Sequence, residues 1–209
     1  MKFVRTVRIL SVLCLCVAGQ MAEAGPKIDH WVAPSGARVF FVENHDLPIL
    51  DVQVDFSAGT VYDPQGKEGL ASMTEGLLDM GVQGMDENQL SNRMADLGAL
   101  LSGGADMDRA SISLRTLSAA DKRVPALDVL QAVLATPQFP QDVFEREKAR
   151  TISALKESLT RPDAIASKAF WAAMYPAHAY GRYSTVESVS GLQRDDLLAF
   201  YRSHFTAQR

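Results

Sequence analysis

Cysteine is almost absent from this sequence. Cys14 and Cys16 are its two cysteines, and both lie within the first 24 residues. Residues 25 to 209 therefore contain no disulfide bond, no cysteine nucleophile and no cysteine-based zinc site. The chain also lacks low-complexity tracts and internal repeats, while 47% of its residues are hydrophobic and 22% are charged. This composition is typical of a globular protein of one or two domains that is stabilised by packing.

Positive charge is also scarce. Removing the first 24 residues takes away three basic residues and one acidic residue, which leaves 18 basic and 24 acidic residues and a net charge of −6. Neutralising phosphates requires clustered lysine and arginine side chains. The sequence therefore predicts that nucleic acid is not a partner.

The first 24 residues have the pattern of an export signal. Lys2, Arg5 and Arg8 precede the apolar run Ile9–Gly19, and Ala22-Glu23-Ala24 provides small residues for signal peptidase. A membrane anchor is the alternative, but a helix needs about 20 apolar residues to cross about 30 Å of hydrocarbon. We expect residues 1–24 to be a signal peptide cleaved after Ala24, which predicts a periplasmic protein without a stable membrane anchor.

Hydrophobic periodicity predicts the first half of the remaining chain. Alternation favours strands over residues 38–43 and 49–57, which we expect to pair antiparallel across the turn at Asn44–Pro48. Helical spacing predicts a helix from Leu70 to Met80, ended by Gly81. A second helix is expected between a cap at Asp86 and Gly98.

The second half continues with strands and then helices. Strands are predicted at 100–103 and 105–117 with Gly103-Gly104 at their junction, followed by a helix capped by Ser118. Further helices are expected from Pro140 to Leu159, from Pro162, and over 192–205. On the helix that begins at Pro162, three side chains at helical spacing are predicted to be core residues: Phe170, Trp171 and Met174. This order predicts an α+β fold, with helices packed on one face of a largely antiparallel sheet.

Several motifs resemble those of the insulinase/pitrilysin metallopeptidases. Ala58-Gly59-Thr60-Val61-Tyr62-Asp63-Pro64 running into Gly69-Leu70-Ala71 is similar to the entry of their active-site helix. The segments Asn44–Pro48, Phe144–Lys148 and His178–Arg182 resemble the family in the same order. The resemblance covers nearly all of residues 25–209. It implies an N-terminal domain like that of mitochondrial processing peptidase, truncated before a last strand and a second homologous domain.

In active members of that family the helix carries an HxxEH motif. Two histidines one turn apart bind zinc, and the glutamate activates water. The resemblance places Ser72 and Gly76 at the histidines, Glu75 at the glutamate, and Ala154, or else nearby Glu157, at the third ligand. A catalytic zinc site normally has three protein ligands. The resemblance therefore implies that zinc is absent and that this chain alone is inactive, although its family is one of zinc metalloendopeptidases.

The four histidines do not suggest another metal centre. His30 and His45 lie in the strand region, His178 lies in a loop, and His204 lies near the end. In the resembled family a histidine at the position of His178 is not a zinc ligand, and we expect it to be structural.

Three functions are compatible with these observations. The first is a non-catalytic subunit that pairs with an active zinc-bearing paralogue and helps form a chamber for an extended peptide. The second is a scaffold that binds peptides or assembles proteins without a peptidase partner, holding an extended chain along a sheet edge. The third is a zinc metalloendopeptidase with an unrecognised metal site.

Overall fold

A three-stranded antiparallel sheet forms the centre of the molecule, in a computed structural model that describes residues 25–207. Its order is β3-β7-β6, where the strands span Ile49–Phe56 (β3), Ala110–Leu117 (β7) and Leu100–Ala105 (β6). Val52 lies opposite Leu114 in the first pair, and Leu101 lies opposite Leu114 in the second. The predicted α+β fold is confirmed.

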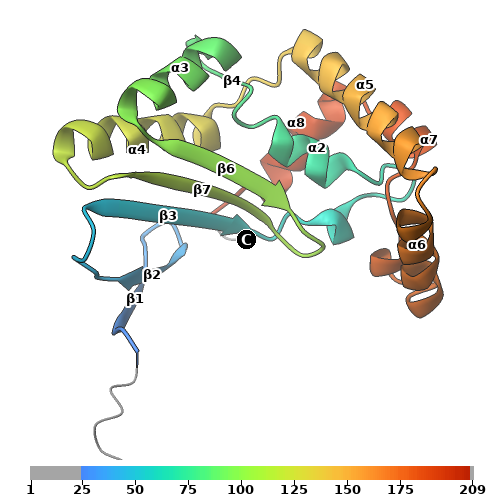
Figure 1. Ribbon diagram of the computed structural model, residues 1–209, viewed down its shortest axis with the longest axis horizontal. Helices are drawn as coiled ribbons and strands as arrows, with labels where there is room; N and C mark the ends of the chain where they lie inside the picture. The colour runs from blue at the N-terminus through green and yellow to red at the C-terminus, as the bar shows by residue number, and fades with distance from the viewer. Residues whose placement is uncertain (1–24, 208–209) are drawn as a thin grey trace, which may run out of the picture.

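Helices cover one face of this sheet (Figure 1). Alternate residues of β7 point to that face and are buried: Ala110, Ile112, Leu114 and Thr116. Four helices pack there, namely α2 (Leu70–Gly76), α3 (Glu87–Leu97), α4 (Ala120–Ala135) and α8 (Arg194–His204). The opposite face is polar, and its cross-strand pair Asp51–Arg115 has an Oδ1–Nε distance of 2.6 Å. This two-sided pattern follows from the period of two in a strand.

The N-terminal hairpin differs from the predicted strand pairing. β2 (Arg38–Val42) pairs with β1 (Ile28–Val32), while β3 pairs with β7. The predicted pairing of 38–43 with 49–57 is therefore wrong. The close turn before β2, with Gly36 at φ 91°, joins β1 to β2. β3 instead adds buried Phe56 and half-buried Val52 and Val54 to the covered face of the sheet, where they contribute hydrophobic stabilisation.

The helix predicted from Leu70 to Met80 is shorter than expected. α2 ends at Gly76, and the amides of Leu77 and Leu78 bond to carbonyls three residues earlier. Both leucines turn into the core, being 2% and 1% exposed, and the chain then enters β4 (Gly81–Val82). β4 pairs with β5 (Met85–Asp86), a short hairpin that the sequence did not predict.

Capping was predicted correctly for α3 and incorrectly for α4. Asp86 accepts a hydrogen bond from the amide of Gln89 at 2.8 Å, and the Gln89 side chain accepts from the amide of Asp86. Gly98 ends α3 in the left-handed conformation, at φ 63°. α4, in contrast, begins after Ala119, and Ser118 does not cap it. Ser118 instead donates its backbone amide to the carbonyl of Pro48, just before the start of β3.

The reversal between β6 and β7 lies later than predicted. Gly103 and Gly104 are inside β6, and the chain turns at 106–109. Asp106 Oδ1 accepts hydrogen bonds from the amides of Asp108 and Arg109, each at 2.7 Å. An aspartate that bonds to amides two and three residues ahead is typical of a turn. The two glycines therefore do not form the turn between the strands.

Three helices and a 3-10 turn separate α4 from α8 in the sequence. They are α5 (Gln141–Ser158), α6 (Pro162–Met174) and the short α7 (Val186–Ser190), with a 3-10 turn at Ala179–Gly181 (η3). The prediction that Phe170 and Met174 are core residues is wrong, since they are 58% and 57% exposed. α6 lies beyond the end of α5 (Figure 1) and packs mainly on η3, so little of it is covered. Among residues 25–207, no helix has the length and apolarity needed to cross a membrane.

Candidate functional site

The candidate site is built on α2, whose start is anchored by a buried carboxylate. Asp63 accepts hydrogen bonds from the amide of Gly69 at 2.7 Å and from that of Ala71 at 2.8 Å. Burial raises the pKa of Asp63 to about 6, although these two amides act in the opposite direction. Gly69 has φ 107°, which favours glycine at this position. These contacts hold the first turn of α2 in place.

The positions matched to the two zinc-binding histidines lie on the exposed side of α2. Ser72 and Gly76 are one turn apart, and both are exposed. A Cβ atom added to Gly76 would have nothing within 4 Å, so the space beside it is open. Ala154 and Glu157 are exposed on α5. Two positions on α2 are thus still spaced to bind one metal ion, but neither carries a side chain that is a zinc ligand.

These residues do not fit a zinc ion. A serine hydroxyl, a glycine and an alanine methyl cannot replace the histidine and carboxylate ligands of a catalytic zinc site. Within residues 25–207, no group of three or more histidine, cysteine, aspartate or glutamate side chains is placed to hold a metal. Ser72, Gly76 and Ala154 therefore supply no ligand for a metal-dependent step.

The histidines have other contacts. His178 Nδ1 accepts from the amide of Tyr180 at 3.2 Å, at the start of η3. His45 pairs with Glu43, His30 stacks on Phe40, and His204 stacks on Phe200 at a ring distance of 4.2 Å. Each histidine thus contacts a different neighbour, in a different part of the fold.

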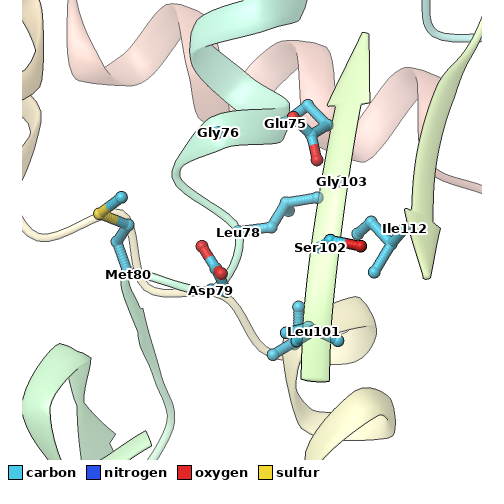
Figure 2. Close-up of a pocket in the computed structure, with 10 residues that line it drawn as sticks. Glu75, Gly76, Leu78, Asp79, Met80, Leu101, Ser102, Gly103 and Ile112 are labelled. Carbon is cyan, nitrogen blue, oxygen red and sulfur yellow. The ribbon is translucent and has the colours of Figure 1, made fainter. Parts of the chain in front are cut away.

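Glu75 points inward from α2 and is only 9% exposed. Its carboxylate lies against β6, where a Cβ atom added to Gly103 would be 2.0 Å from Glu75 Oε1 (Figure 2). It makes no hydrogen bond or ion pair to any residue in the described part of the chain. Burial, and then the nearby charge of Asp79, raises the pKa of Glu75 to about 7. Glycine at position 103 thus makes room for this carboxylate.

A cavity of about 220 Å³ opens beside Glu75, between α2 and β6 (Figure 2). Asp79 lines the same cavity, and burial raises its pKa, although a hydrogen bond from its own amide acts in the opposite direction; repulsion from Glu87 adds a smaller increase. The remaining walls are largely apolar side chains from β6, β7, α4 and the segment after α2, namely Leu78, Met80, Leu101, Ile112 and Val133. Sequence analysis did not identify Asp79. The available signal was a carboxylate between Leu78 and Met80, inside an otherwise apolar run.

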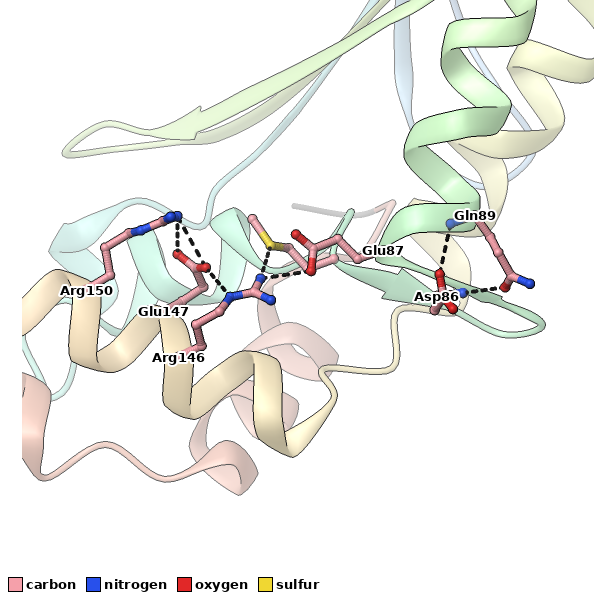
Figure 3. Close-up of polar contacts among 7 residues, drawn as sticks. Asp86, Glu87, Gln89, Arg146, Glu147 and Arg150 are labelled. Carbon is pink, nitrogen blue, oxygen red and sulfur yellow. Dashed lines mark hydrogen bonds and ion pairs between the residues drawn. The ribbon is translucent and has the colours of Figure 1, made fainter.

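A charged network borders this cavity (Figure 3). Arg146 on α5 donates to Glu87 at 2.8 Å and to Glu147 at 2.9 Å, and also contacts the sulfur of Met80. Arg150 binds Glu147 at 3.1 Å. Glu147, which lies in the segment Phe144–Lys148 that resembles the family, is therefore already paired with two arginines. The network ties α5 to α3 and to the segment that follows α2.

Comparison with known proteins gives concordant results. The sequence pattern of the insulinase family (peptidase family M16) matches residues 38–185. A probable mitochondrial-processing peptidase subunit beta from Arabidopsis thaliana is 24% identical over 179 residues, which is 84% of this chain and 33% of that protein.

Solved structures also share the fold. A peptidase M16 inactive domain from Pseudomonas fluorescens has a TM-score of 0.80 and 32% identity, covering 84% of this chain and 43% of that one. Pitrilysin has a TM-score of 0.74 and 19% identity, covering 90% and 20%. The chain therefore spans less than half of each of these proteins. The matched pattern covers most of the chain and agrees with the antiparallel sheet and the α2 entry motif, so this protein belongs to the insulinase family, peptidase family M16.

Proposed function

We propose that this protein is a non-catalytic subunit, exported to the periplasm, that pairs with a zinc-bearing paralogue and helps form its peptide-binding chamber. One observation carries the proposal. The active-site helix is anchored by Asp63 and packed on the sheet, yet Ser72 and Gly76 stand at its metal-binding positions. A scaffold kept without its ligands is suited to binding and not to hydrolysis.

Two relatives support this proposal. The Pseudomonas fluorescens structure, 32% identical, is described as an inactive domain of a peptidase. The Arabidopsis thaliana relative is described as a probable subunit of a processing peptidase.

A second candidate is a peptide-binding scaffold without a peptidase partner. β6 is an edge strand of the described sheet, with β7 as its one neighbour there. An edge strand offers unpaired amides and carbonyls that an extended peptide can bind. Peptide binding by the chain in the absence of any paralogue, with no effect on a paralogue's activity, would favour this function.

The test is zinc content and peptidase activity, measured for this chain alone, for a zinc-bearing paralogue alone, and for their mixture. We expect no stoichiometric zinc and no cleavage by this chain, and faster cleavage by the mixture than by the paralogue. A paralogue variant without its zinc ligands is the control for activity arising from the partner. Stoichiometric zinc and cleavage by this chain alone would support the third candidate, a zinc metalloendopeptidase, and contradict the proposal.

Export is tested separately. Expression with the leader should deliver the protein to the periplasmic fraction, with Gly25 as its new N-terminal residue. Retention of residues 1–24 on the exported protein would contradict the proposed cleavage.

A further inference from the structure

We propose that the cavity between α2 and β6 binds the basic side chain of a peptide, a lysine or an arginine. This inference rests on the proposed function only in taking the ligand to be part of a peptide. It concerns this chain alone and requires neither zinc nor a partner subunit. Three features of the cavity lead to it.

The first feature is the buried acid on the wall of the cavity. Glu75 is nine-tenths buried and lines the cavity, and its carboxylate has no hydrogen-bond or ion-pair partner among residues 25–207. Burying a carboxylate without a partner is costly, and proteins normally pair such a group with a cation or with hydrogen-bond donors. A ligand that brings a cation to Glu75 would remove this cost.

The second feature is a second carboxylate without a cation. Asp79 lines the same cavity, and its charge acts on Glu75. Arg146, the arginine bound to Met80 at the edge of the cavity, is already paired with Glu87 and Glu147. No lysine or arginine among the described residues forms an ion pair with Glu75 or Asp79. The site therefore lacks a positive charge that a ligand can supply.

The third feature is the apolar lining. Leu78, Leu101, Ile112 and Val133 surround the two carboxylates. Lysine and arginine bury their methylene stems against apolar surface and place the charged group at the end. A cavity of about 220 Å³ has room for several groups the size of a water molecule, each about 30 Å³. A side chain with an aliphatic stem and a positively charged end matches both the two carboxylates and the apolar walls of the cavity.

A bare metal ion fits this lining less well. Calcium takes six to eight oxygen ligands, and magnesium requires an octahedral shell. The cavity offers two carboxylates and the hydroxyl of Ser102 among mostly apolar groups. The apolar walls instead favour a ligand with an aliphatic segment that can contact them.

The test uses three tripeptides that differ at one side chain: acetyl-Ala-Lys-Ala-amide, its arginine counterpart, and its norleucine counterpart, which keeps the stem without the charge. Binding to the full chain is measured by calorimetry or NMR titration at about pH 8, where Glu75 is ionised. We expect the lysine or arginine peptide to bind at least about tenfold more tightly than the norleucine peptide. This comparison needs no variant and therefore does not depend on how a substitution affects folding.

Two variants locate the site. Glu75→Gln and Asp79→Asn keep the shape of each side chain and remove its charge, and each should weaken binding of the preferred basic peptide by about tenfold. Asp128→Asn, which changes an exposed carboxylate on α4, is the matched control and should leave binding unchanged.

Three results would each overturn the inference. They are equal binding of the norleucine peptide, unchanged binding by both variants, and no saturable binding up to roughly 10 mM peptide. Since the paralogue is absent, a failure of the mixing experiment does not affect this result. Equally, a failure here does not affect the proposed pairing.

Discussion

At the scale of single residues, the fold disfavours ionisation of the Glu75 carboxyl group. Burial raises the pKa of Glu75 from 4.5 to about 7. Its proton is held more tightly in the folded than in the unfolded chain, so its contribution to stability is fully present below about pH 4.5 and is lost as the pH rises through 7. At neutral and higher pH the ionised carboxylate destabilises the fold.

This gives a prediction for Glu75→Gln. At about pH 8 the variant should unfold with a free energy about 2 kcal/mol higher than the original chain, a value reduced from the full linkage because the cavity admits some solvent. At about pH 4.5 most of this difference should disappear. Urea unfolding of both proteins at the two pH values measures it. A difference of the same size at both pH values would show that the effect does not come from the charge.

At the scale of elements, the contact of α2 with β6 explains one of the two glycines in the strand, Gly103. Gly103 faces the Glu75 carboxylate, whereas a Cβ atom added to Gly104 would meet nothing within 4 Å. Gly103→Ala should therefore force Glu75 or β6 to move and lower the free energy of unfolding by about 2 kcal/mol. Gly104→Ala is the matched control, and should change it by less than about 0.5 kcal/mol. Equal effects in thermal or urea unfolding would contradict this account.

The exposed face of α2 leads to a second prediction at this scale. Ser72→His and Gly76→His place two imidazoles one turn apart on a side of the helix with open space. Adding Ala154→Glu should raise zinc affinity by more than about tenfold over the double variant, because it supplies a third ligand. Competition with a chromogenic chelator measures the affinity. If the triple variant binds zinc no more tightly than the double variant, Ala154 is not the third position.

At the scale of the whole molecule, apolar surface gathers on the N-terminal hairpin. Ile28, Val32, Phe40 and Val42 lie on one face of this hairpin, at 59%, 67%, 66% and 46% exposure. Contiguous exposed apolar surface is typical of a site that another surface covers. We expect the isolated chain to self-associate, as measured by sedimentation velocity, and Phe40→Lys to reduce this. A monomeric chain with a sharp, reversible thermal transition would contradict the prediction.

The sequence alone predicted much of this architecture. The α+β class, the α3 cap at Asp86 and the start of α6 at Pro162 followed from local patterns that the structure confirms. The family resemblance, carried by the motif that enters α2, is also confirmed. Such features depend on residues close together in the sequence, because caps, turns and periodicity act within a few positions. That Ser72 and Gly76 stand in place of the two zinc-binding histidines can likewise be read from the sequence alone.

Tertiary structure decided the remainder. β2 pairs with β1 and β3 pairs with β7, since strand partners are chosen by which faces can be buried together. Phe170 has the helical spacing of a core residue, yet α6 lies where little covers it. The clearest case is the cavity, which brings Glu75 and Asp79 against Gly103, more than twenty residues away in the sequence. Local pattern shows which residues are present, whereas burial, and with it the pKa of Glu75, depends on long-range packing.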